Sequence, residues 1–114
     1  MTESDRHRIG HIRDYCNAIS QTIQRYGNSF EQYIEDQDYQ RSICFSILQI
    51  GELVGGLSQE YRKATASRVQ WGPIKAMRNL VVHGYGSVDH KTIWETVTID
   101  IPALLQFCEE QLQQ

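Results

Sequence analysis

The side chains best suited to chemistry in this sequence lie within residues 77–86, Met-Arg-Asn-Leu-Val-Val-His-Gly-Tyr-Gly. Arg78, Asn79, His83 and Tyr85 are its polar members. Histidine titrates near neutral pH and can take a proton from a ribose 2′-hydroxyl or give one to a leaving oxygen. Arginine stays charged and can bind a phosphate in bidentate fashion, while asparagine can orient either partner. The group is therefore suited to phosphodiester cleavage.

No cluster of acidic residues accompanies this stretch, so the sequence does not indicate a two-metal mechanism. An internal 2′-hydroxyl nucleophile needs no metal and restricts the substrate to RNA. Chemistry of this kind would act on RNA and would use no metal or other cofactor. Another interpretation stays open on the residues alone: a solvated arginine, and a helix-terminal histidine that bonds a carbonyl.

Helical geometry sets a condition on this site. Residues five apart in a regular helix point about 140° away from each other, because each residue turns about 100°. Arg78 and His83 can then converge only if the helix ends near Val82, or if two chains bring their copies together.

Apolar residues recur at steps of three and four along most of the chain, which predicts helices with one buried face. These stripes cover residues 9–26, 43–57, 74–81 and 94–112. Between the second and third stripes, residues 61–70 are polar and are predicted to form a helix tail and a loop. We expect an all-α fold, an antiparallel bundle of four main helices plus short helical segments, in a single domain over residues 1–114.

Capping residues predict where the first elements begin and end. Gly27-Asn28 is a suitable stop for the first helix. Ser29 with Gln32 resembles a capping box that starts a short segment over residues 30–35. Asp36 or Asp38 could cap the next long helix.

Glycine and proline mark irregular positions. Gly51 and Gly55 share a face of the second long helix, which a close approach of another helix would explain; the alternative is a break near Gly55. Pro73 suits the first turn of the third helix. Asp89 can cap the last helix, and Pro102 should kink it or mark a local irregularity.

Composition is that of a globular protein, with 40% hydrophobic and 22% charged residues among 114. The net charge of −3 does not indicate a general nucleic-acid binder, so RNA would require a local basic patch. Three cysteines without a C-x-x-C pair make zinc clusters and disulfides unexpected, and Cys16 and Cys108 fall in phase with the apolar stripes. Without an apolar signal or membrane-spanning run, we expect a cytoplasmic protein.

The motif resembles a known family. Arg78-Asn79-x-x-x-His83-x-Tyr85 is similar to the R-x4-H-x-Y motif of the HepT-like toxins, a branch of the HEPN superfamily. The similarity extends to Ile50-Gly51-Glu52, to Trp71, and to Val88-Asp89 with Trp94, and so covers nearly the whole chain.

This resemblance implies an all-α endoribonuclease that acts without a metal ion, usually as a homodimer whose two motifs face one cleft. It assigns the catalytic roles to Arg78, Asn79 and His83. It also implies a partner, a MntA-like nucleotidyltransferase antitoxin that transfers AMP from ATP to Tyr85. Phosphate groups two residues from His83 would fill the cleft and repel RNA.

Glu52 lies close to the apolar stripe of the second long helix, and a buried carboxylate there needs a partner such as Arg78. We expect an orienting role for Glu52 rather than direct proton transfer. A second interpretation of the whole chain is a non-catalytic accessory subunit of a minimal nucleotidyltransferase. A third is a purely structural helical dimer, against which the polar cluster argues.

Overall fold

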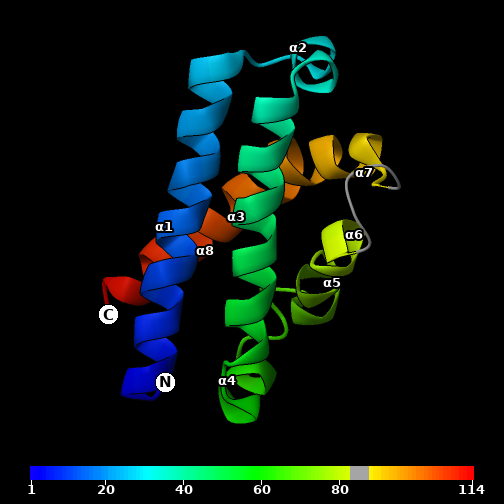
Figure 1. The fold of residues 1–114 in the computed structure, drawn as a ribbon. Helices are drawn as coiled ribbons and strands as arrows, with labels where there is room; N and C mark the ends of the chain where they lie inside the picture. Colours follow the sequence, from blue (N-terminus) through cyan, green and yellow to red (C-terminus); the bar gives the residue numbers. More distant parts are fainter. Residues whose placement is uncertain (83–87) are drawn as a thin grey trace.

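A computed structural model of the chain describes residues 1–82 and 88–114, and every regular element in these ranges is helical (Figure 1). The predicted all-α fold is confirmed. The elements are α1 (Glu3–Tyr26), α2 (Phe30–Glu35), α3 (Gln37–Gly55), α4 (Gln59–Ala64), α5 (Trp71–Ala76), α6 (Asn79–Val82), α7 (His90–Glu95), the π-helical turn η2 (Thr96–Asp100) and α8 (Ile101–Leu112). None of the described helices is long and apolar enough to span a membrane.

The two longest helices, α1 and α3, lie side by side in opposite directions, and α8 passes behind them at an oblique angle (Figure 1). The apolar stripes predicted from the sequence form their contact. In α1 the buried stripe includes Ile9, Ile12, Cys16 and Ile19. In α3 it includes Ile43, Ile47, Ile50 and Val54, and Cys108 of α8 is also fully buried.

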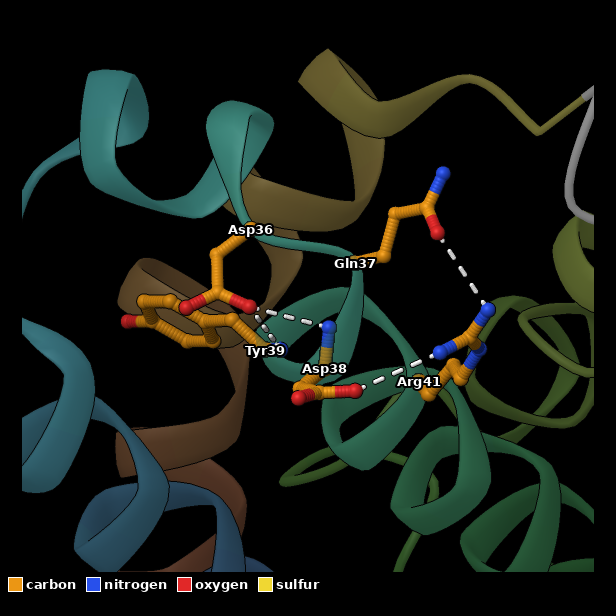
Figure 2. Close-up of polar contacts among 5 residues, drawn as sticks. All are labelled: Asp36, Gln37, Asp38, Tyr39 and Arg41. Carbon is orange, nitrogen blue, oxygen red and sulfur yellow. Dashed lines mark hydrogen bonds and ion pairs between the residues drawn. The ribbon is translucent and has the colours of Figure 1, made fainter.

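The chain reverses direction between α1 and α3 through the predicted stop and caps. Gly27 ends α1 with a φ of 113°, a conformation that favours glycine. Ser29 accepts a hydrogen bond from the Gln32 amide and so begins α2. Of the two aspartates considered, Asp36 is the cap of α3: its carboxylate accepts from the backbone N–H groups of Asp38 and Tyr39 (Figure 2).

Two predicted elements differ from the structure. Residues 61–70 are not merely a helix tail and a loop, because a separate helix, α4, begins at the Ser58 cap. The third main helix is divided into α5 and α6. Around the division the amides of Arg78, Leu80 and Val81 bond carbonyls three residues back, the pattern of a 3₁₀ turn.

The irregularity expected at Pro102 is present. The π-helical turn η2 ends at Asp100, and Pro102 occupies the first turn of α8, where its missing N–H is tolerated. Two threonine hydroxyls of this region donate to backbone carbonyls one turn earlier: that of Thr96 to the Thr92 carbonyl at 2.9 Å, and that of Thr98 to the Trp94 carbonyl at 2.8 Å. The last predicted helix therefore runs without a gap from α7 to α8, but its hydrogen-bonding pattern changes at η2.

A buried carboxylate joins the start of α1 to the start of α4. Asp5 is 1% exposed, and its oxygens accept from the Ser58 amide at 2.7 Å and the Ser58 hydroxyl at 2.6 Å. It also accepts from the Thr2 amide, completing a capping box. Burial raises the pKa of Asp5, but the hydrogen bonds from Ser58 and Thr2 outweigh it and hold the pKa below its usual value.

Asp5→Ala is expected to lower the free energy of unfolding by about 2 kcal/mol at neutral pH, because it leaves charge-assisted bonds unmade. Since the folded pKa is depressed, this stability is present above the pKa of the unfolded carboxyl and is lost as the pH falls through the folded pKa. Urea unfolding of the wild type and of Asp5→Ala, at pH 7 and below pH 4, measures the difference in the free energy of unfolding at each pH. Asp14→Ala, at an exposed site, is the control; an equal loss in the two variants would contradict the prediction.

Candidate functional site

The first half of the motif lies on the α5–α6 segment, which two apolar side chains fix in the core. Trp71 is buried at the start of α5, where its indole N–H donates to the Thr65 hydroxyl at 2.8 Å. Met77, between α5 and α6, is buried as well. Arg78 and Asn79 follow directly and are both exposed. The sequence thus presents two polar side chains to solvent from an anchored turn.

Gly51 allows this turn to approach α3 closely. A Cβ atom at Gly51 would lie 2.8 Å from the Cβ of Arg78, and 3.4 Å from the Arg78 amide nitrogen. The close approach expected from the two glycines of α3 is therefore confirmed at Gly51. At Gly55 it is not, because a Cβ there meets only the end of the Lys75 side chain at an ordinary 3.5 Å, and α3 ends at this residue.

Arg78 forms an ion pair with Glu52 of α3 through its Nε atom. This is the partner expected from the sequence, but the expected burial is wrong: the side chains are 45% and 56% exposed. Gly51 is on the buried face of α3, and Glu52, the next residue, is turned about 100° away from it toward solvent. An exposed pair contributes about 0–1 kcal/mol to stability, so its main effect is to restrict the direction of the guanidinium. The guanidinium has five N–H donors, enough to bind a second anion.

Asn79 begins α6 and adjoins Arg78 on the exposed surface. His83 and Tyr85 lie outside the described residues. The expected convergence of Arg78 and His83, and the accessibility of the Tyr85 phenol, therefore stay predictions from the sequence. The described part of the site is an oriented arginine beside an amide, which can bind an anionic oxygen but needs a further group for proton transfer.

The match of this chain to a protein family is decisive for its classification. The sequence model of the family described as "Ribonuclease HepT-like" matches residues 10–111. The chain belongs to the HepT-like ribonuclease family. The expected membership of this family is confirmed, and the matched range contains Arg78, Asn79, His83 and Tyr85.

Individual relatives of the HepT-like chain carry ribonuclease names. A protein of Caldanaerobacter subterraneus subsp. tengcongensis named "Putative RNase" is 34% identical over 93% of this chain and 92% of its own length. A "Probable ribonuclease HepT" of Thermococcus cleftensis is 26% identical over 81% of this chain and 87% of its own. No solved structure matches the chain.

On the far side of the motif, the HepT-like chain is anchored again at the start of α7. Asp89 caps this helix, as predicted, by accepting from the Thr92 amide at 3.1 Å. His90 bonds the hydroxyl of the buried Tyr33 of α2 at 2.7 Å. Burial lowers the pKa of His90, an effect that the Asp89 charge partly offsets. His90 therefore holds α7 against α2 as a structural residue.

Sequence reasoning missed a groove of about 680 Å³ between the α5–α6 segment and η2 with α8. Ile74, Met77 and Leu80 line it on one side, and Thr96 and Leu104 on the other. Its two walls are distant in the sequence, so only tertiary packing brings them together. Glu52, Arg78 and Asn79 are not among the residues that line this groove, so it differs from the described part of the candidate site, although Leu80 of the motif forms part of its wall.

Proposed function

We propose that this HepT-like protein is a metal-independent endoribonuclease whose catalytic residues are Arg78, Asn79 and His83. The observation that carries the proposal is the family match over residues 10–111, which contains the complete R-x4-H-x-Y motif. The fixed position of Arg78 against Gly51, with its guanidinium directed by Glu52, supports the assignment of Arg78 as a phosphate-binding residue.

In the proposed reaction, His83 accepts the proton of a ribose 2′-hydroxyl, whose oxygen attacks the adjacent phosphorus. The bond to the 5′-oxygen of the next nucleotide breaks, and this oxygen takes up a proton as it leaves. The products are a 2′,3′-cyclic phosphate and a 5′-hydroxyl, so no water or redox partner is consumed. Arg78 stabilises the negative charge that develops on the phosphate, and Asn79 orients the reacting groups.

Incubation of the purified protein with single-stranded RNA in excess EDTA tests this function. We expect cleavage to continue in EDTA, to leave 2′,3′-cyclic phosphate ends, and to stop at any position where a 2′-deoxynucleotide replaces the ribonucleotide. Cleavage that requires an added divalent metal would contradict the proposed chemistry. Tight binding to a nucleotidyltransferase without cleavage of any RNA would favour the accessory-subunit interpretation instead.

We further propose that two chains form the working unit and that the protein is the toxin of a toxin–antitoxin pair, switched off by AMP transfer to Tyr85. The support is the tyrosine two residues after His83 and the match of the whole motif to the family. In the transfer, the Tyr85 oxygen would form a bond to the α-phosphorus of ATP and pyrophosphate would leave. The added phosphate charge beside His83 would repel RNA.

Coexpression with an active MntA-like nucleotidyltransferase is expected to add one or more AMP groups to the Tyr85 peptide and to remove ribonuclease activity. Activity should be lost because the AMP groups place bulk and negative charge two residues from His83. Mass spectrometry of the peptide and an RNA cleavage assay measure the two effects. Tyr85→Phe is the matched control, because it should stay unmodified and active beside the same partner. AMP on another residue with equal inhibition would refute the role of Tyr85.

A further inference from the structure

A line of exposed positions runs along α3 past the candidate site. Phe45, Glu52 and Gly56 are separated by seven and four residues, so they share one face of α3 and of the turn that follows it. All three are exposed, and from Phe45 to Gly56 the line spans about 16 Å at 1.5 Å per residue. This length accommodates a few nucleotides of an extended strand.

Helix α1 contributes two side chains to the same line. Tyr15 packs edge-on against Phe45, with ring centroids 6.2 Å apart. One end of the line therefore carries an aromatic pair, in which Phe45 is 55% exposed. Seven residues before Tyr15, and so on the same face of α1, Arg8 lies against Gly56 at the other end.

The contact of Arg8 with Gly56 requires a glycine. A Cβ atom at position 56 would lie 2.5 Å from the central carbon of the guanidinium. Within residues 1–82 and 88–114, Arg8 forms no ion pair, and its buried Nε has no hydrogen-bond partner. The cation is therefore held in place without a counter-charge from the described residues.

We name the surface formed by Arg8, Tyr15, Phe45, Glu52 and Arg78 the α1–α3 strip. It carries two arginines and one glutamate, and so is locally positive in a chain of net charge −3. Proteins bind single-stranded RNA with aromatic rings on which bases stack and with cations along the same groove that contact phosphates, and the strip combines both. A stable dimer buries about 800 Å² per partner with an apolar centre, which one exposed phenylalanine does not supply.

We propose that the α1–α3 strip is the path of the single-stranded RNA substrate, with a base stacked on Phe45 and a phosphate bound by Arg8. Arg78 and its Glu52 partner lie between these two contacts. The inference rests on the proposed ribonuclease function. It adds the surface that the RNA follows across the protein, which runs parallel to α3. It also resolves how an acidic chain binds RNA, through a local strip rather than a basic surface.

The test measures binding of a short 2′-O-methylated oligouridine, which lacks the free 2′-hydroxyl needed for cleavage, by fluorescence anisotropy at several salt concentrations. Phe45→Ala is expected to weaken binding about five- to a hundredfold through lost stacking, with an unchanged salt dependence. Arg8→Gln is expected to weaken binding and to reduce the slope of log K against log salt by about 0.7, the value for one phosphate contact on a single strand. Arg8→Lys should restore that slope.

Matched controls come from outside the strip: Phe30→Ala on α2 removes another exposed aromatic, and Arg25→Gln another exposed arginine of α1. Both should bind like the wild type. Wild-type affinity in Phe45→Ala and Arg8→Gln would overturn the proposal. So would a lower melting temperature of Arg8→Gln with unchanged RNA affinity, since Arg8 would then only stabilise the end of α3. A change of oligomeric state in Phe45→Ala without a change in affinity would assign the surface to a second copy.

The binding measurement and the cleavage assay test the two proposals separately. If the wild type cleaves RNA and the two strip variants bind normally, the ribonuclease proposal stands and the path is wrong. If the wild type binds the oligonucleotide through Phe45 and Arg8 but cleaves no RNA, the strip is an RNA-binding surface and the ribonuclease proposal fails.

Discussion

Arg78→Ala and His83→Ala are each expected to abolish detectable RNA cleavage while leaving the helical fold intact. A positioned acid or base contributes about 10²- to 10⁴-fold to the rate, and an arginine that binds the reacting phosphate contributes a similar factor. Arg78 is 45% exposed, and its pair with Glu52 contributes little to stability, so its loss should change reactivity rather than folding. Initial cleavage rates and far-ultraviolet circular dichroism measure the two properties.

Arg41→Ala is the matched control for the arginine variant. Arg41 is also an exposed arginine in an ion pair with a residue of α3, Asp38, and it contacts Gln37 as well (Figure 2). Its removal should leave the cleavage rate near that of the wild type. Full activity in both Arg78→Ala and His83→Ala would refute the assigned roles. Equal losses in Arg78→Ala and Arg41→Ala would show that surface charge, not position, determines the rate.

The helices were predictable from the sequence because burial imposes its period directly on residue types. Apolar residues at steps of three and four from Ile9 to Ile19 lie on one face of a helix, so that face was expected in the core, and the structure buries it fully. Helix ends were predictable where capping is local. Gly27 and Ser29 act within a few residues of the chain, so no tertiary information was needed.

The pairing of Glu52 with Arg78 and the close approach at Gly51 were expected from the sequence, but other features that depend on contacts between distant segments were not predictable. The division between α5 and α6 follows from the packing of this turn on α3, and the stripe of Ile74 and Met77 alone reads as one continuous helix. Glu52 was expected to be buried because it lies beside an apolar stripe. It is exposed, because in a helix the residue after the buried Gly51 can already face solvent. The contact of Arg8 with Gly56 joins residues 48 positions apart and leaves no pattern in the sequence.

Gly51→Ala is expected to lower the cleavage rate about 10- to 100-fold, although residue 51 is buried against the turn that carries Arg78. The new methyl group would lie 2.8 Å from the Cβ of Arg78, closer than two such atoms normally approach. That Cβ is fixed to the backbone and cannot swing away as the end of a flexible chain can, so the α5–α6 turn must move away from α3. A shift of about 1 Å in a catalytic group can cost about a hundredfold in rate.

The effect on stability should be much smaller than the effect on rate, which separates misplacement from unfolding. Alanine in place of a helical glycine gains about 1 kcal/mol, and overpacking costs about 1–3 kcal/mol, so the two terms partly cancel. The control is Gly55→Ala, the same change one turn later, where the new atom meets only the end of Lys75 at 3.5 Å. Cleavage rates and melting temperatures of both variants make the comparison. Wild-type activity in Gly51→Ala would mean that the position of Arg78 against α3 does not limit the reaction.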